Sequence, residues 1–279
     1  MAVMTIQLVS NILRRPVPVN VAIYADKRCF PGMPIPPKGP YKTLYLLHGA
    51  YGDHTDWTTF TRVYEYAKEY SLCVVMPYGE NKFYCDSDIT GEPWGKFISE
   101  ELVSTIEETF NVSRKREDRY IGGLSMGGFG AFVNAFRHPE VFSKVIAFST
   151  ATIKSQILNS PKAQEGLFTE SQYRSRFGLK DVADYENSKD DYEYLARQLK
   201  DYPDKPEIYM ACGTEDSLFE GNLTYKNLLV DLGFKVDWHA DPGAHTFTFW
   251  NDHIKEAIAW LKLGESNPGV FSGNVAPIK

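Results

Sequence analysis

One short stretch carries the clearest chemical signal in the sequence. Gly123-Leu-Ser125-Met-Gly127 has the pattern G-x-S-x-G, with an apolar strand-like run before it and a helical pattern after it. A chain that reverses sharply at the serine crowds the positions two before and two after it, and glycine there removes the clash. Such a turn lifts the Ser125 hydroxyl above a sheet and aims a helix N-terminus at the reacting centre. We therefore predict a nucleophilic serine that attacks an acyl carbon.

A serine hydroxyl is a weak nucleophile at neutral pH, so it needs a base. For a serine on this kind of turn, an acid and then a histidine are expected further along the chain. His239 falls inside a predicted strand and His253 inside a predicted helix, whereas His245 falls in a loop after a strand. Because loops at the carboxyl ends of strands carry the chemistry of such sheets, His245 is the predicted base.

The base in turn needs a carboxylate that orients it. Two carboxylates, Glu215 and Asp216, follow the predicted strand 207–212, and Asp241 is a third candidate. Chain order and loop position favour Asp216. The predicted catalytic set is therefore Ser125, Asp216 and His245.

Acyl transfer also needs donors for the negative charge that develops on the carbonyl oxygen. One donor is expected from the N–H group of Met126, which follows the serine, and the second from the loop after an earlier strand. Leu46-Leu-His-Gly-Ala50 occupies that place, and we predict the Ala50 N–H group as the second donor. His48 precedes the serine in the chain, so it is interpreted as a loop-shaping residue rather than a base.

Apolar runs of strand length alternate with helical patterns along the chain. Strands are expected at 17–24, 43–47, 72–76, 119–122, 144–149, 207–212 and 235–240, and helices at 57–70, 98–110, 127–137, 190–200, 222–232 and 250–261. This alternation predicts the α/β class: a mostly parallel, twisted sheet with helices on both faces. Because no helix separates the first strands, they are expected to form an antiparallel edge.

The chain is interpreted as a single domain, 1–279, with two irregular segments. Residues 151–205 are polar and charged and interrupt the alternation, so they are predicted to form a small lid-like insertion. A surface excursion without a role in binding is the alternative. Residues 264–279 are predicted to be a disordered tail or an arm that contacts a neighbour.

Aromatic side chains gather in or near the loops expected at the carboxyl end of the sheet. They are Tyr51, Trp57, Phe83, Tyr84, Trp94 and Phe247. Each one alone is more often a core or rim residue than a substrate contact. Together they predict an apolar substrate pocket, with Tyr51, Trp57, Phe83, Trp94 and Phe247 as the contact residues.

Composition excludes several classes of protein. Among 279 residues, 36 Asp and Glu against 30 Lys and Arg give a net charge of −6, which disfavours a nucleic-acid partner. No apolar run is long enough to cross a bilayer, and the start of the chain lacks a secretion signal, so we expect no membrane association and a cytoplasmic location. The four cysteines and six histidines are scattered, and no H-E-x-x-H motif occurs. We therefore predict no disulfide framework, no metal and no cofactor.

The motifs resemble those of a known family. Leu46-Leu-His-Gly49 with Trp57, Gly123–Gly128, Cys212–Asp216 and His245 with Trp250 are similar to the esterase D family of α/β-hydrolases, in particular its tributyrin (acetyl) esterase branch. The resemblance covers about residues 15–263 and is weak in the first strands, the insertion and the tail. It implies an α/β-hydrolase fold, a serine carboxylesterase with Ser125, Asp216 and His245 as triad, and Ala50 and Met126 as oxyanion hole.

The resemblance leaves several substrates open. We expect hydrolysis of a small-molecule ester with an acetyl to butyryl acyl group; feruloyl or acetyl-xylan ester hydrolysis and S-formylglutathione hydrolysis are the alternatives. Ala50-Tyr-Gly-Asp53 departs from the Leu-Thr-Cys-Thr run of the thioester hydrolases, which disfavours that activity. An acyltransferase with the same triad and a catalytically silent binding protein of this fold are further alternatives. The number of subunits, including a homo-oligomer, is left open.

Overall fold

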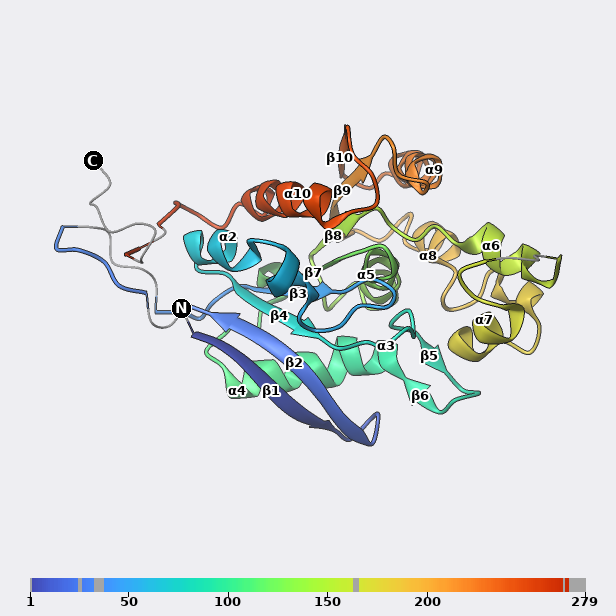
Figure 1. The fold of residues 1–279 in the computed structure, drawn as a ribbon, viewed down its shortest axis with the longest axis horizontal. Helices are drawn as coiled ribbons and strands as arrows, with labels where there is room; N and C mark the ends of the chain where they lie inside the picture. Colours follow the sequence, from blue (N-terminus) through green and yellow to red (C-terminus); the bar gives the residue numbers. More distant parts are fainter. Residues whose placement is uncertain (1, 25–26, 33–37, 163–165, 268, 271–279) are drawn as a thin grey trace.

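An eight-stranded sheet forms the centre of the molecule (Figure 1). The computed structural model describes residues 2–24, 27–32, 38–162, 166–267 and 269–270. The strand order is β1-β2-β4-β3-β7-β8-β9-β10. The strands are β1 (Ala2–Ser10), β2 (Arg15–Ile23), β3 (Thr43–Leu47), β4 (Cys73–Pro77), β7 (Arg119–Leu124), β8 (Lys144–Phe148), β9 (Glu207–Gly213) and β10 (Val236–Asp241).

The sheet is parallel from β4 to β10, and β1 and β2 form an antiparallel edge. The predicted fold class and antiparallel edge are confirmed. Strand β1 lies before the first strand that the sequence predicts. Its outward positions include Val3 and Val9, which are 40% and 71% exposed, so apolar residues stand on both of its faces. The alternation that marks a half-buried strand is therefore blurred.

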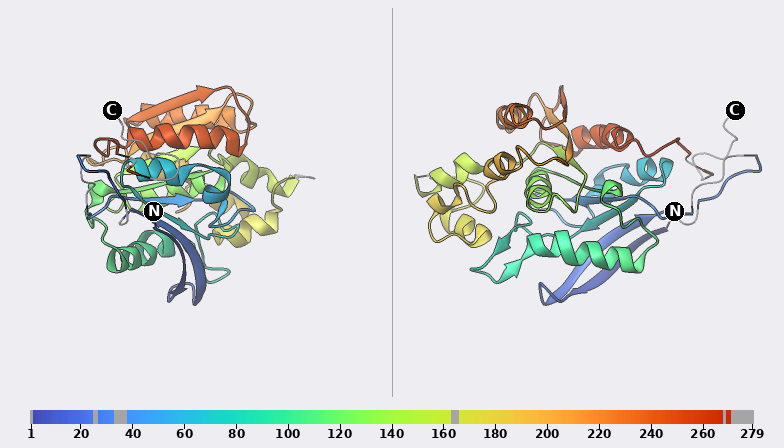
Figure 2. Two further views of the ribbon diagram at one scale, coloured as in Figure 1. Left: turned by 60° about the vertical axis from the view of Figure 1, so that its left-hand side comes forward. Right: turned by 180° about the vertical axis from the view of Figure 1, so that it is seen from behind.

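Helices cover both faces of the sheet (Figure 2). One layer holds α1 (Asp56–Phe60), α2 (Val63–Glu69) and α10 (Phe247–Trp260); the other holds α4 (Leu102–Thr109), α5 (Met126–Arg137), α8 (Tyr192–Gln198) and α9 (Phe219–Asp231). Strand β3 shows how the layers are separated: Tyr45 and Leu47 join one apolar cluster, and Leu44 and Leu46 join the other. This alternation follows from the period of two in a strand.

Two predicted helices differ from the observed ones. The single helix expected at 57–70 is divided into α1 and α2 at Thr61, which is extended and whose hydroxyl accepts a hydrogen bond from the Val63 N–H group. The helix expected at 98–110 begins earlier, as α3 (Trp94–Lys96) and a π-helical turn, η1 (Phe97–Glu101), before α4. The buried face nevertheless includes Ile98, Leu102 and Ile106, as predicted.

The segment 151–205 lies between β8 and β9 and extends beyond the carboxyl ends of the parallel strands (Figure 1). Besides α8 it contains α6 (Lys154–Asn159) and α7 (Glu170–Phe177), which the sequence analysis does not predict. A local signal for α7 was present, because Thr169 and Gln172 form a capping box and Gly178 ends the helix. The tail predicted at 264–279 falls mostly outside the described residues.

An ionic cluster joins this segment to the body of the protein. Arg137, at the end of α5, is 2.8 Å from Asp86 and 3.4 Å from Asp190 of the segment 151–205. Asp86 belongs to a small two-stranded sheet, which consists of β5 (Asp86–Ser87) and β6 (Glu92–Pro93). Burial raises the pKa of Asp190 to about 7, and Arg137 offsets only part of this effect.

This raised pKa predicts how stability depends on pH. A carboxyl whose pKa is higher in the folded protein stabilises it below the unfolded-state pKa, and that contribution is lost as pH rises through the folded-state pKa. We expect Asp190 to lower Tm as pH rises from about 4 to about 7, and Asp190→Asn to flatten this fall, because the amide cannot ionise. Calorimetry across that range measures both slopes. Asp88→Asn, whose side chain is 94% exposed, should keep the wild-type slope; equal slopes in all three proteins would contradict the expectation.

Among the helices that the structure describes, none is both long enough and apolar enough to cross a membrane.

Candidate active site

Ser125 occupies the turn between β7 and α5 in a backbone conformation that residues other than glycine seldom adopt. Its φ is 53° and its ψ is −116°. The Ser125 N–H group donates to the Phe148 carbonyl at 2.9 Å, and the Ser125 carbonyl accepts from the Ala151 N–H group at 3.0 Å. These bonds to the neighbouring strand and its loop hold the serine in a strained backbone conformation, as expected of a residue positioned for chemistry.

Two glycines allow this turn. A Cβ atom on Gly123 would stand 2.5 Å from the Gly127 carbonyl carbon, which is the crowding that the sequence predicts. A Cβ atom on Gly127 would stand 2.4 Å from the Leu47 carbonyl oxygen, so the second glycine is required by the loop that follows β3. The two glycines of the G-x-S-x-G pattern are therefore required by two close backbone contacts. One lies within the turn, and the other is to the end of β3.

His245 and Asp216 meet although 29 residues separate them. His245 Nδ1 is 2.8 Å from Asp216 Oδ2. The loops after β9 and β10 are joined by a hydrogen bond from the Glu215 N–H group to the Gly243 carbonyl at 2.9 Å. The loops approach so closely that a Cβ atom on Gly213 would lie 2.0 Å from the Gly243 oxygen. Gly213 is thus a residue of the site in addition to those that the sequence predicts.

The environment of Asp216 keeps it ionised. Burial by itself would raise the pKa of its carboxyl group, but hydrogen bonds from His245, the Leu218 N–H group and the Ser149 hydroxyl outweigh this and lower the pKa below its usual value. Ser149 also accepts a hydrogen bond from Trp250 Nε1 at 3.1 Å. The Trp250 ring packs perpendicular to His245, with 4.8 Å between ring centroids. An ionised acid and a packed ring together orient the imidazole.

The other candidate residues lie elsewhere. Glu215 is exposed, and its side chain makes no hydrogen bond to His245. Asp241 lies 3.5 Å from His253 Nε2, and His239 Nε2 lies 3.2 Å from Asp237. Of the predicted acids, Asp216 is the one that contacts His245.

Ser125 and His245 both line one cavity of about 550 Å³. Within the part of the chain that the structure describes, no hydrogen bond joins the Ser125 hydroxyl to His245, and catalytic hydrogen bonds often tighten only when substrate binds. The rest of the lining is Ala151, Ile153, Gln156, Asn159, Ser160, Gly166, Leu167, Phe168, Tyr173, Ser217 and Leu218. Except for Ser217 and Leu218, these residues belong to the segment 151–205.

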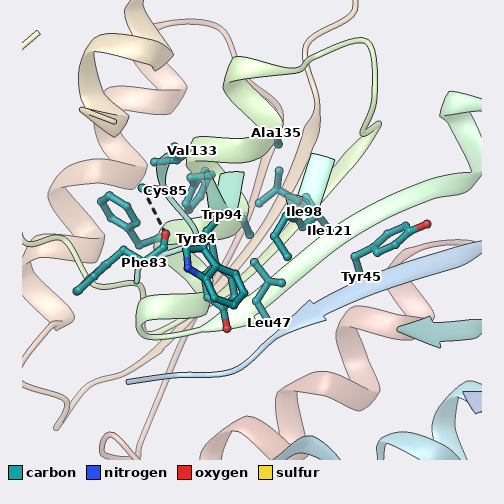
Figure 3. Packing of buried hydrophobic residues seen from close by; sticks show 14 of the residues in the cluster. Tyr45, Leu47, Phe83, Tyr84, Cys85, Trp94, Ile98, Ile121, Val133 and Ala135 are labelled. Carbon is teal, nitrogen blue, oxygen red and sulfur yellow. Dashed lines mark hydrogen bonds between the residues drawn. The ribbon is translucent and has the colours of Figure 1, made fainter. Parts of the chain in front are cut away.

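The aromatic residues predicted to contact substrate do not line this cavity. Trp57, Phe83 and Trp94 are at most 1% exposed, so that prediction is wrong for them. The Trp57 indole N–H group donates to the Leu47 carbonyl at 3.0 Å, and Phe83 and Trp94 lie in the apolar cluster under α5 (Figure 3). Large rings next to strand ends are buried here, because they fill the space beneath the loops rather than above them.

Tyr51 and Phe247 also lie outside the lining, although each contacts a residue near it. Tyr51 is 72% exposed, and its ring stacks on that of Phe168 with centroids 6.2 Å apart. Phe247 packs against Trp250, with centroids 5.0 Å apart. Neither is part of the lining of the cavity that Ser125 and His245 share, and their contact with substrate stays a prediction.

The loop after β3 lies against the serine turn. A Cβ atom on Gly49 would stand 3.6 Å from Ser125 Cβ, which brings the neighbouring Ala50 close to the serine. Met126 is the first residue of α5, where N–H groups have no partner within the helix. Among the described residues, no hydrogen bond is donated by the N–H group of Ala50 or Met126. Both groups are therefore available to the oxygen of a substrate carbonyl.

His48 shapes this loop, as the sequence predicts. Its ring is buried, and its Nε2 atom accepts a hydrogen bond from the Gly79 N–H group at 2.9 Å. The proton therefore belongs on Nδ1, which lies 2.7 Å from the Gly49 carbonyl oxygen. Burial lowers the pKa of His48 to about 4, so the ring stays neutral and both its nitrogens are engaged.

The remaining reactive side chains include possible metal ligands and free cysteines. Among the described residues, no group of three or more His, Cys, Asp or Glu side chains is arranged to hold a metal ion. Cys73 and Cys212 are buried free thiols, and burial raises the pKa of each to about 12, which agrees with their interpretation as small core residues.

The sheet order, the strained serine on the β7–α5 turn and the His–Asp pair on the last two strand loops define an α/β-hydrolase. The Esterase family model matches residues 18–261. The chain therefore belongs to the Esterase family and is a carboxylic ester hydrolase, which confirms the resemblance drawn from the motifs.

Known proteins support this assignment. An acetyl esterase from Caldicellulosiruptor saccharolyticus is 35% identical over 94% of this chain and 98% of its own. FphF, a fluorophosphonate-binding serine hydrolase of Staphylococcus aureus, is 25% identical with a TM-score of 0.79, covering 95% of this chain and 99% of its own. The S-formylglutathione hydrolase FrmB of the same organism is 23% identical with a TM-score of 0.77, covering 94% and 99%. This last likeness is one of fold.

Proposed function

We propose that the protein is a serine esterase that hydrolyses short-chain esters, acetyl to butyryl, through an acyl-enzyme intermediate. The observation that carries the proposal is the His245–Asp216 pair, 2.8 Å apart, beside a cavity that Ser125 also lines. A base already oriented by an ionised acid, next to a strained serine, is the arrangement that activates a hydroxyl for acyl transfer.

The proposed reaction has two halves. The Ser125 oxygen attacks the ester carbonyl carbon while its proton passes to His245 Nε2, the ring nitrogen that faces away from Asp216. The N–H groups of Ala50 and Met126 stabilise the resulting oxyanion, each by about 3 kcal/mol. The C–O bond to the alcohol then breaks, and His245 returns the proton to the departing oxygen. Water repeats these steps on the acyl-enzyme and releases the acid, which restores Ser125.

The cavity supports an ester with a small acyl group and a larger alcohol part. Its volume of about 550 Å³ exceeds what an acetyl or butyryl group alone can fill. Its wall combines apolar side chains such as Ile153 and Phe168 with the polar Gln156 and Asn159, which suits an alcohol that carries both kinds of surface. The similarity to an acetyl esterase favours the same small acyl group.

Three measurements test the proposal. A fluorophosphonate probe should label the folded protein at Ser125; absence of labelling would favour a silent binding protein. In a panel of acetyl, butyryl, octanoyl, feruloyl and S-formylglutathione substrates, kcat/KM should be highest for the acetyl and butyryl esters. Faster cleavage of octanoyl or feruloyl esters would overturn the short-chain assignment. Transfer of the acyl group to an added alcohol, in preference to water, would replace hydrolysis by acyl transfer.

A further inference from the structure

The turn that carries the proposed oxyanion donor Ala50 has an unusual residue at its third position. The Gly52 N–H group donates to the Gly49 carbonyl at 3.2 Å, so Gly49, Ala50, Tyr51 and Gly52 form a β-turn. Tyr51 has a φ of 63°, where such turns favour glycine or asparagine. Its side chain is 72% exposed, so burial of the ring does not account for this backbone conformation. Another contact has to hold the turn.

Two side chains contact the turn: His48 Nδ1 lies 2.7 Å from the Gly49 carbonyl oxygen, and Asn81 binds the peptide group that follows Ala50. Asn81, in the loop after β4, accepts a hydrogen bond from the Tyr51 N–H group through its Oδ1 atom at 2.7 Å. This bond fixes the peptide group between Ala50 and Tyr51. Because Ala50 precedes that peptide group directly, the direction of its own N–H group depends on the same turn. Without this bond the contacts at the Gly49 carbonyl remain, but the peptide group between Ala50 and Tyr51 is no longer held. We therefore expect Tyr51 to relax from its positive φ and the Ala50 N–H group to change direction.

Asn81 is itself held by the segment 151–205. Arg176 of α7 donates two hydrogen bonds to main-chain oxygens. Its Nε atom donates to the main-chain carbonyl of Asn81 at 2.7 Å, and its Nη1 atom donates to the main-chain carbonyl of Gln172 at 2.9 Å. Its guanidinium group lies 4.0 Å from the centroid of the Phe168 ring. Phe168 also stacks on Tyr51 and lines the cavity that holds Ser125. One arginine thus connects the cavity wall to the loop that supports the turn.

We propose that Asn81 is a positioning residue that aims the Ala50 N–H group at the oxyanion, and that Arg176 holds Asn81 in place from the segment 151–205. This inference rests on the proposed function, since it needs Ala50 as an oxyanion donor. It assigns to that segment a part in setting kcat, in addition to lining the cavity.

A pair of substitutions of similar shape separates the hydrogen bond from packing. Asn81→Leu removes the acceptor, and Asn81→Asp keeps it. We expect Asn81→Leu to lower kcat by about 10- to 100-fold, less than the outright loss of an oxyanion donor, with KM within about twofold. Asn81→Asp should keep kcat within about threefold of the wild type. The affinity for a trifluoromethyl ketone, whose adduct places an oxyanion in the same site, should fall with kcat/KM in Asn81→Leu alone.

The control is another asparagine of the same chemistry. Asn251 Oδ1 accepts the Arg62 N–H group at 2.8 Å, and Asn251→Leu should leave kcat unchanged. In a double-mutant cycle, Arg176→Gln with Asn81→Leu should cost little more than Asn81→Leu alone, because both act through the same turn. Equal kcat values for Asn81→Leu and Asn81→Asp, or an equal loss in Asn251→Leu, would overturn the inference. Ser125→Ala tests the proposed function separately, because it removes the nucleophile and leaves Tyr51, Asn81 and Arg176 unchanged.

Discussion

Replacement of Ser125 by alanine is expected to lower kcat by about four to six orders of magnitude and to leave Tm nearly unchanged. The hydroxyl is the proposed nucleophile, so its loss removes the acyl-enzyme route altogether. The side chain faces the cavity and is only partly buried, so alanine leaves no void in the core. The strained backbone is kept, because the hydrogen bonds to Phe148 and Ala151 use main-chain atoms.

Three readouts make this expectation specific: steady-state hydrolysis of p-nitrophenyl acetate, fluorophosphonate labelling and thermal unfolding. Ser125→Ala should lose the first two and keep the third. Ser104→Ala, on the exposed side of α4, should match the wild type in all three. Hydrolysis by Ser125→Ala within about tenfold of the wild type would show that another group performs the chemistry.

The serine turn was predictable because its cause is local. The steric conflict that demands Gly123 arises from the strand–turn–helix path itself, and that path is visible in the sequence; Gly127 is demanded by the approach of Leu47 at the end of β3. The partnership of Asp216 with His245 was predictable for a related reason. Parallel strands end on the same side of a sheet, so loops distant in sequence are brought together by topology.

The cavity could not be predicted in the same way. Its walls come from the segment 151–205, whose polar composition hides single apolar residues such as Ile153 and Phe168 that recur with no helical or strand period. The predicted contact residues Trp57, Phe83 and Trp94 follow strands in the sequence, but their side chains are buried. Proximity to a strand end specifies the edge of the sheet, and it does not specify the direction of a side chain.

The contacts that hold the turn from Gly49 to Gly52 could not be predicted for a third reason. The Tyr51–Asn81 hydrogen bond joins a main-chain donor to a side chain 30 residues away, and the Arg176–Asn81 bond spans 95 residues. No motif spacing records either contact. The feature that points to these contacts is the positive φ of Tyr51, which only the three-dimensional structure shows.

The second large effect is expected at Asp216. Asp216→Asn should lower kcat by about 10⁴-fold, because an amide N–H group facing Nδ1 favours the imidazole tautomer whose Nε2 carries the proton and cannot accept another. KM should change little, since Asp216 does not line the cavity. Glu215→Gln makes the same chemical change on the adjacent, exposed residue and should keep wild-type activity.

The same substitution also has a signature in stability. Because the folded protein lowers the pKa of Asp216, its hydrogen-bonded carboxylate stabilises the fold above the unfolded-state pKa, and this contribution is lost as pH falls through the folded-state pKa. The difference in Tm between the wild type and Asp216→Asn should therefore be largest near neutral pH and shrink below about pH 4. A loss of kcat in Asp216→Asn no greater than that in Glu215→Gln would mean that His245 is oriented without the carboxylate. The Trp250 ring that packs against the imidazole would then be the remaining group that holds it.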